Sequence, residues 1–269
     1  MADELKRQDG VAYREAGPEG GPAALLVHGF SESSYMWKDL LPAVADAGWR
    51  AVAPDLPGSG DSPADRPGTW ERQVEALEHF RSGLGLDRVA LVAHDWGGLI
   101  GLRWACDNPD AVRALVISNT GFFPDGEWHG LAQLMRTEGK GEELMENMDR
   151  DTFGAMLTQS TSAMDDRALD EYWKAFADED RRMTHLDLYR SGDFEKLEPY
   201  EGKLADLAVP SLILWGEDDP FAPVAGAHRF HRELPDSSLV VLERAGHFVF
   251  EDEPEQTARA VVEFLDRLS

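Results

Sequence analysis

The chain has 269 residues, 42% of them hydrophobic, which is long enough to bury the core of one large α/β domain. Its formal net charge of −25 at pH 7 repels polyanions, so nucleic acid and membrane surfaces are not expected as partners. A single cysteine, Cys106, permits no internal disulfide and fits a reducing compartment. The sequence shows no signal peptide and no apolar run long enough to span a bilayer. We therefore expect a cytoplasmic protein.

Short apolar runs alternate with helical patterns along most of the chain. Strands are predicted, in chain order, at 23–27, 51–55, 89–93, 113–118, 211–215 and 238–242. Helices are predicted between and after them, at 36–47, 69–83, 94–106 and 254–268. Continuous apolar strands separated by helices are typical of a parallel sheet that is covered on both faces.

Residues 121–205 interrupt this rhythm, because they contain no good strand pattern and mix Met, Phe and Trp with Asp and Glu. We predict several helices here, inserted between two strands of the sheet. Such an insertion could serve stability alone. However, ligands of open α/β sheets bind beyond the carboxyl ends of the strands, where a segment that follows residue 118 would lie as a lid. The prediction is a core made of 1–120 and 206–269, with a helical cap at 121–205 that lines an apolar pocket.

The stretch VAHDWGG at 92–98 leads from a strand through two glycines into a helix. It is similar to the G-x-S-x-G turn, in which an exposed nucleophile precedes a helix, but Asp95 occupies the serine position and Ala93 the first glycine. Such a turn aims the next backbone N–H, that of Trp96, at the reacting centre. Taken alone the motif is weak, because aspartate is also a common helix N-cap.

Later segments supply the partners that a carboxylate nucleophile needs, namely a base for water and an acid that orients the base. His247 follows the last predicted strand, and Asp218 and Asp219 follow the strand before it. The order nucleophile, acid, histidine is that of the α/β-hydrolase fold. His-Gly at 28–29 follows the first core strand, where this fold supplies a second N–H for an oxyanion, here from Phe30.

The set HGF, PDLPGSGDS, HDWGG, WGEDDPFAP and AGHFVFEDEP spans 25–255 in order and resembles α/β-hydrolase-fold enzymes of the epoxide hydrolase and haloalkane dehalogenase group. The resemblance implies an α/β fold with a mostly parallel, twisted sheet and a helical cap after the fourth predicted strand. It also implies that Asp95 forms a covalent alkyl ester, which His247 hydrolyses by activating water. The acid is expected three residues after the glycine of the WG turn, which selects Asp219 over Asp218. The backbone N–H groups of Phe30 and Trp96 would form the oxyanion hole. Water is the only co-reactant, so neither a cofactor nor a metal is implied.

The two activities of this group differ in what receives the leaving group. Epoxide hydrolases typically use two lid tyrosines to protonate the alkoxide, and Tyr189 lies where the second is expected, 30 residues before Asp219. No tyrosine occupies 140–145, where the first is expected. Tyr172 comes late in the cap, and His129 is a cap histidine that could substitute.

Dehalogenases typically bind halide through the indole after the nucleophile and through a second Trp or an Asn that follows His-Gly. Trp96 fits both activities, Phe30 occupies the Asn position, and Trp128 or Trp173 could supply a second indole. We predict an epoxide hydrolase that converts small hydrophobic epoxides to vicinal diols, with haloalkane dehalogenase as the alternative. A non-catalytic small-molecule binding protein on the same fold is a further alternative. The predicted catalytic residues are Asp95, Asp219, His247 and Tyr189, and the predicted substrate-binding residues are Trp96, Phe30, Tyr172 and Trp128.

Overall fold

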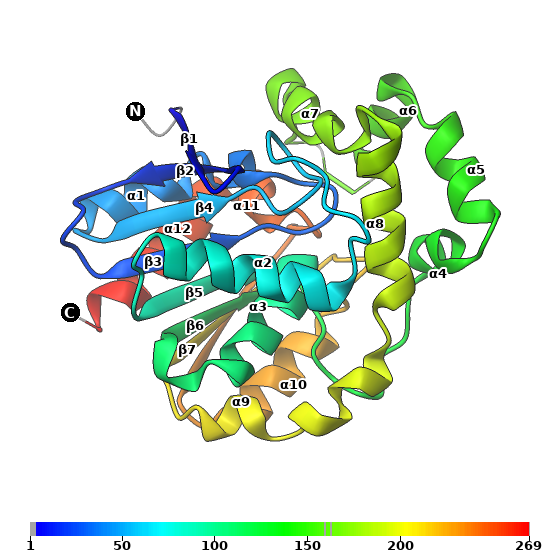
Figure 1. Ribbon diagram of the computed structural model, residues 1–269. Helices are drawn as coiled ribbons and strands as arrows, with labels where there is room; N and C mark the ends of the chain where they lie inside the picture. The colour runs from blue at the N-terminus through cyan, green and yellow to red at the C-terminus, as the bar shows by residue number, and fades with distance from the viewer. Residues whose placement is uncertain (1–3, 159, 162, 269) are drawn as a thin grey trace.

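The computed structural model describes residues 4–158, 160–161 and 163–268 (Figure 1). Eight strands within these ranges form one sheet in the order β1-β2-β4-β3-β5-β6-β7-β8. Only β2 runs antiparallel to its neighbours, and every other adjacent pair is parallel. The bounds are Leu5–Gln8 (β1), Val11–Ala16 (β2), Ala23–Val27 (β3), Arg50–Pro54 (β4), Val89–His94 (β5), Val112–Ser118 (β6), Ser211–Gly216 (β7) and Ser237–Leu242 (β8).

The six predicted strands are confirmed as β3 to β8, each within one residue at either end. They were recognisable because β3, β5 and β7 are buried along their whole length and therefore consist of uninterrupted apolar runs. Strands β1 and β2 were not predicted from the sequence. Their sequences, LKRQ and VAYREA, carry charged residues, because these two strands lie at one side of the sheet and are only partly buried.

Helices cover both faces of the sheet (Figure 1). The pair α2 and α3 pack together on one face, and α1 and α12 pack together on the other. The helix predicted at 36–47 is divided into a 3-10 turn, η1 (Ser34–Trp37), and α1. The core helices are α1 (Leu40–Asp46), α2 (Trp70–Gly83), α3 (Trp96–Asp107), α10 (Ala225–Glu233), α11 (Val249–Asp252) and α12 (Pro254–Asp266), with a short 3-10 turn, η2 (Pro109–Ala111).

The stretch 121–205 is helical, without a strand among the residues described there. Its helices are α4 (Gly130–Arg136), α5 (Lys140–Asn147), α6 (Arg150–Leu157), α7 (Asp166–Trp173), α8 (Glu179–Ser191) and α9 (Lys203–Asp206), with 3-10 turns η3 (Lys174–Phe176) and η4 (Phe194–Tyr200). Asp149, Asp165 and Asp178 cap α6, α7 and α8, each accepting a first-turn backbone N–H. Some of the acidic residues in this stretch therefore serve as helix N-caps. The division into core and cap at 120 and 205 stays a prediction.

The strand register brings the loops that follow the strands to one edge of the sheet. Ala93 pairs with Val27 on one side and with Ile117 on the other, and His94 pairs with Ser118. The carboxyl ends of β3, β5 and β6 are therefore level, and β7 continues the series through the pairing of Ser118. Polar residues that follow these strands meet at this edge, where open α/β sheets bind ligands.

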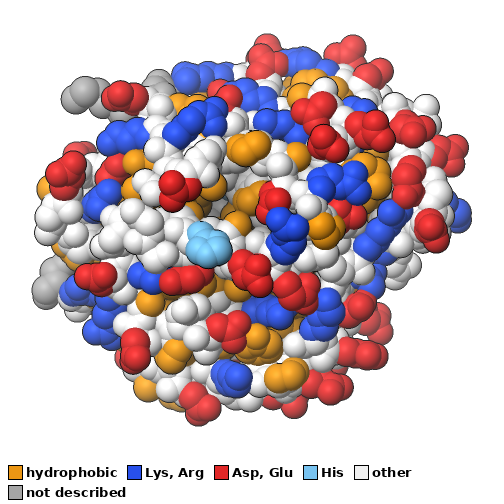
Figure 2. All heavy atoms as spheres, viewed as in Figure 1, with side chains coloured by type: hydrophobic (Ala, Val, Ile, Leu, Met, Phe, Trp, Pro, Cys, Tyr) orange, Lys and Arg blue, Asp and Glu red, His pale blue; other side chains and the backbone are white. Residues whose placement is uncertain are grey.

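On the face seen in Figure 2, acidic and basic side chains are interspersed, so the net charge of −25 is not gathered into one patch there. Every helix within the described ranges is too short or too polar to cross a bilayer.

Candidate active site

Asp95 occupies a strained corner between β5 and α3, with φ 50° and ψ −123°. A positive φ is uncommon for a residue with a side chain, and surrounding contacts must maintain it. The hydroxyl of Thr120 donates to the carbonyl oxygen of Asp95 at 2.7 Å. Two glycines allow the close approach of neighbouring backbone: a Cβ on Gly97 would lie 2.2 Å from the carbonyl oxygen of Val27, and one on Gly29 would lie 2.4 Å from Cβ of Asp95.

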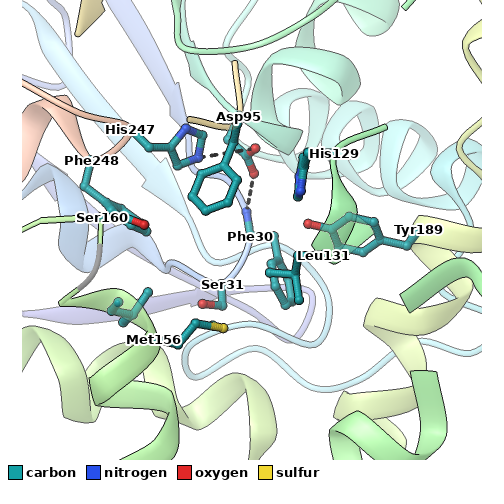
Figure 3. A pocket seen from close by; sticks show the side chains of 12 residues that line it. Phe30, Ser31, Asp95, His129, Leu131, Met156, Ser160, Tyr189, His247 and Phe248 are labelled. Carbon is teal, nitrogen blue, oxygen red and sulfur yellow. Dashed lines mark hydrogen bonds and ion pairs between the residues drawn. The ribbon is translucent and has the colours of Figure 1, made fainter. Parts of the chain in front are cut away.

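The Asp95 carboxylate lies between a backbone donor and an imidazole (Figure 3). The N–H of Phe30 donates to Oδ1 at 2.8 Å, and Nε2 of His247 lies 3.5 Å from Oδ2. Burial alone would raise the pKa of Asp95, but the hydrogen bond and positive charge of His247 and the N–H of Trp96 lower that pKa to about 2. Asp95 is therefore an anion at neutral pH, the form in which a carboxylate attacks.

His247 is held from its other side by Asp219, with Nδ1 2.8 Å from Oδ2. Burial would lower the pKa of His247, but the charges and hydrogen bonds of Asp219 and Asp95 raise it well above 6.5. The structure thus brings together the three residues predicted as nucleophile, base and acid. Asp218 is exposed, and of the two neighbouring aspartates it is Asp219 that contacts the imidazole in the described structure.

The Asp219 carboxylate is fully engaged. Its Oδ1 accepts the backbone N–H groups of Phe221 and Ala222 at 2.7 and 2.9 Å, and its Oδ2 also accepts Nδ2 of Asn119 at 2.7 Å. The sequence analysis missed Asn119. A polar residue immediately after a buried strand was the signal that could have identified it, since Asn119 directly follows β6.

A cavity of about 430 Å³ opens beside Asp95 (Figure 3). Residues of the cap and of the core share its walls, and most of them are apolar. The lining residues are Phe30, Ser31, Asp95, His129, Leu131, Met156, Leu157, Ser160, Tyr189, Phe221, His247 and Phe248. This lining matches the apolar pocket predicted from the Met and aromatic content of the cap.

Tyr189 directs its hydroxyl into this cavity (Figure 3). Within the described part of the chain, the hydroxyl makes no hydrogen bond of standard geometry, although the side chain of Trp96 interacts with it. Burial, followed by the negative charge of Asp95, raises the pKa of the phenol well above 10, although the nearby Trp96 opposes the shift. The phenol therefore keeps its proton at neutral pH and can donate it to a ligand.

His129 lines the cavity beside Asp95. From the sequence it was expected in the cap, but its location relative to Asp95 was not predicted. Its Nδ1 accepts the backbone N–H of Ala132, at 3.4 Å, as the N-cap of α4. Burial lowers the pKa of His129, so the ring is neutral at neutral pH. With Nδ1 as the acceptor, the ring hydrogen lies on Nε2, which makes His129 a second neutral donor.

A second hollow, of about 1210 Å³, also has Asp95 in its lining. His129 and Phe221 line both hollows, and their rings are in contact with centroids 4.9 Å apart. Trp128 lines the second hollow, and its indole N–H already donates to the carbonyl of Gly192 at 2.9 Å.

Two residues predicted to bind substrate, Tyr172 and Trp96, do not line either hollow at Asp95. Tyr172 is fully buried, its hydroxyl bonds to Glu251, and it lines neither hollow at Asp95. The position of Tyr172 in the sequence did not show which way its side chain points, because packing of the cap against the core determines that direction. Trp96 also lines neither hollow: its ring lies edge to face with that of Tyr189, with centroids 5.1 Å apart, and its buried indole N–H interacts with the Tyr189 side chain without a hydrogen bond of standard geometry.

Among the residues that the structure describes, no three His, Cys, Asp or Glu side chains form a group able to hold a metal ion.

Comparisons with known proteins agree with this fold. The model of the alpha/beta hydrolase fold family matches residues 22–254. A haloalkane dehalogenase of Psychrobacter cryohalolentis is 29% identical, over 95% of this chain and 87% of its own length. The crystal structure of haloalkane dehalogenase DbeA from Bradyrhizobium elkani superposes with a TM-score of 0.86 at 26% identity, covering 98% of this chain and 97% of that one. Epoxide hydrolase VrEH1 from Vigna radiata gives a TM-score of 0.81 at 25% identity, covering 98% and 97%. The chain belongs to the alpha/beta hydrolase fold family, and within it to the group of hydrolases that includes haloalkane dehalogenases and epoxide hydrolases.

Proposed function

We propose that this protein hydrolyses small apolar molecules by displacement at a saturated carbon, through an ester formed on Asp95. One observation carries the proposal: an anionic carboxylate lies 2.8 Å from the N–H of Phe30 and 3.5 Å from Nε2 of His247. A carboxylate that displaces a leaving atom from carbon becomes an ester, which water can cleave. Serine at this position would form an ether, which the same site could not hydrolyse.

In the first step an oxygen of Asp95 bonds to the substrate carbon, and the leaving atom departs with the electron pair of the broken bond. The ester has no negative charge, so the pKa of His247 falls and its ring releases a proton. His247 then removes a proton from water as the water oxygen adds to the ester carbonyl. The resulting oxyanion is stabilised by the N–H groups of Phe30 and Trp96. The alkoxide that is expelled takes the proton from His247, and the new carboxyl group of Asp95 passes its proton to the imidazole, which restores the anionic Asp95 and the protonated His247 of the free protein.

A halide is the leaving group we place first, in preference to the epoxide predicted from the sequence. Similarity to haloalkane dehalogenases, among both curated relatives and crystal structures, supports this choice. Halides are stabilised by neutral N–H and O–H donors. The hydroxyl of Tyr189 and Nε2–H of His129 are two such donors that line the cavity at Asp95.

Epoxide opening is the second candidate, and the Tyr189 hydroxyl favours it. Attack on an epoxide leaves an alkoxide attached to the substrate, which must acquire a proton. Tyr189 retains its proton at neutral pH and directs it into the cavity, so it is able to transfer it.

The test is a paired assay in which bromoalkanes and phenyl-substituted epoxides are offered separately and the release of bromide and of diol is measured. We expect bromide release to dominate and the His247→Gln variant to accumulate the Asp95 ester, detected on the digested peptide by mass. Asp95→Asn is the matched control and should give no adduct. Absence of an ester in His247→Gln with both substrate classes would overturn the proposal.

The Tyr189→Phe variant separates the two leaving groups. If the tyrosine supplies a proton to an alkoxide, diol release should be lost, whereas bromide release should fall only about tenfold through the loss of one hydrogen bond. Dominant diol release by the unmodified protein would reverse the order of the two candidates.

A further inference from the structure

Two buried titratable residues beside the site have no part in the reaction as written, Glu32 and His94. Both side chains are 0% exposed. Nδ1 of His94 lies 2.9 Å from Oε2 of Glu32, and Nε2 of His94 lies 2.8 Å from the carbonyl oxygen of His247. Burial of ionisable groups is costly, and this pair lies directly against the residue proposed as the base.

The positions of the hydrogens follow from what each atom can do. A carbonyl oxygen only accepts, so Nε2 of His94 carries a hydrogen and donates it to His247. A second hydrogen must lie between Nδ1 and Glu32, because two lone pairs would otherwise face each other at 2.9 Å. The pair therefore holds an extra proton, and the resulting charge-assisted hydrogen bond is stronger than one between neutral groups.

Glu32 has a second attachment, to the turn that carries the proposed oxyanion donor. Its Oε2 also accepts the backbone N–H of Gly29 at 3.1 Å, and its own N–H donates to the carbonyl of Gly29 at 3.1 Å. The next residue is Phe30, whose N–H faces Asp95. One carboxylate thus closes this turn and binds His94.

His94 connects the remaining two segments of the site. It is the last residue of β5 and directly precedes Asp95. Its ring also packs on that of His247, with centroids 4.9 Å apart and planes tilted by 50°. The pair consequently links the turn before Phe30, the end of β5 and the loop of His247.

We propose that Glu32 and His94 are positioning residues, which fix the base and the oxyanion donor relative to Asp95 for the cleavage of the ester. This inference rests on the proposed function, since it assigns the pair to the second step of that reaction.

The two steps depend on this pair unequally. Ester formation needs the Asp95 carboxylate, and the backbone that carries it is also held by the elbow and by the hydroxyl of Thr120, which donates to the carbonyl oxygen of Asp95. Ester cleavage needs both the ring of His247 and the N–H of Phe30 at the ester carbonyl, and the pair touches the backbone of both segments. A displacement of about 1 Å in such groups is able to cost about 100-fold in rate.

The test compares Glu32→Gln, which preserves shape, with His94→Phe, which removes both ring nitrogens. Ester formation and ester cleavage are followed separately by rapid quenching with a bromoalkane. We expect cleavage to slow by about 100-fold and formation by less than about threefold, so that ester accumulates on Asp95. His94→Gln keeps an N–H that can donate to the His247 carbonyl, and it should recover part of the cleavage rate relative to His94→Phe.

Ser62→Ala is the matched control for lost stability. Ser62 is fully buried and makes two hydrogen bonds, with the N–H of Ala12 and the carbonyl of Asp55. It touches none of the three linked segments, so its loss should leave the ratio of the two rates unchanged. Equal slowing of both steps in Glu32→Gln and His94→Phe would overturn the inference.

A spectroscopic readout remains informative if His94→Phe does not fold. The two buried ring hydrogens of His94 should give slowly exchanging, far-downfield proton resonances, and Glu32→Gln should shift the one on Nδ1. An unchanged spectrum in Glu32→Gln would contradict the shared proton. If His247→Gln itself forms no ester, the proposed function has failed; if it does and these variants do not accumulate ester, only the present inference has failed.

Discussion

The core and the cap hold their sides of the cavity in different ways. On the core side, the Asp219 carboxylate makes four hydrogen bonds, to His247, Asn119, Phe221 and Ala222. On the cap side, the Tyr189 hydroxyl makes none of standard geometry among the described residues, and the His129 ring makes one hydrogen bond, of 3.4 Å. This difference indicates that the core fixes groups needed for every substrate, whereas the cap leaves its donors free for the ligand.

Among substitutions on the core side of the site, Asp219→Asn is expected to have the largest effect on turnover. The amide cannot hold His247 in the required tautomer, and we expect turnover to fall by about 10⁴-fold, as in other His–carboxylate pairs. Steady-state release of bromide or diol measures the loss. Asp218→Asn is a matched control, because it removes the same charge one residue away and outside the site. Comparable losses in both variants would show that the net charge of the loop matters and not the contact with His247.

The second prediction separates the two steps by pH. The pKa of Asp95 is about 2, so ester formation should stay constant as the pH falls towards about 5. His247 must be neutral to remove a proton from water, so ester cleavage should fall about tenfold per pH unit below the pKa that the ring has in the ester. Because the ester lacks the charge of Asp95, that pKa lies below the raised value of the free protein.

Rapid quenching at a series of pH values, with the fraction of alkylated protein measured by mass, checks this prediction. Acid should increase the amount of trapped ester. A parallel loss of both rates would mean that the carboxylate and the imidazole titrate together, contrary to the low pKa of Asp95.

On the cap side, His129→Phe should have a smaller effect. The variant keeps a ring against Phe221 but removes the Nε2–H donor, and we expect ester formation to slow by about tenfold, the value of one hydrogen bond. Ester cleavage should be unchanged, since it uses core groups. His129→Gln, which retains an N–H, is the control and should recover much of the rate. A larger effect on cleavage than on formation would give the cap a role in activating water.

Tyr172→Phe should have the smallest effect on activity. Its hydroxyl bonds to Glu251, away from the cavity, so the variant should lose about 1 kcal/mol in the free energy of unfolding. Urea denaturation measures this loss, and turnover should stay within about twofold of the unmodified protein. A large loss of turnover with unchanged stability would show that the Tyr172 hydroxyl takes part in substrate binding or catalysis.

The sequence predicted the central part of the fold and the core side of the site for a common reason. Strands that are buried on both faces leave continuous apolar runs, and Asp95 and Asp219 follow such runs in the chain, while His247 follows the apolar part of the half-buried edge strand β8. The pairing of Glu32 with His94 is not visible in this way, because the two residues are 62 positions apart and meet only after the sheet has formed. In the cap, spacing along the chain did not reveal which side of a helix faces the cavity, so Tyr172 was misplaced while Tyr189 lines it.

Because of the tight contacts at Gly29 and Gly97, these two positions should tolerate a side chain far less readily than position 95. The Asp95 side chain lines the cavity, so its far end faces a space that a ligand can enter. Any side chain at position 29 or 97 would meet atoms within 2.4 Å. A different nucleophile at position 95 would change the class of bond attacked, whereas positions 29 and 97 leave no room for a side chain. Diversification of chemistry on this frame therefore requires no new fold.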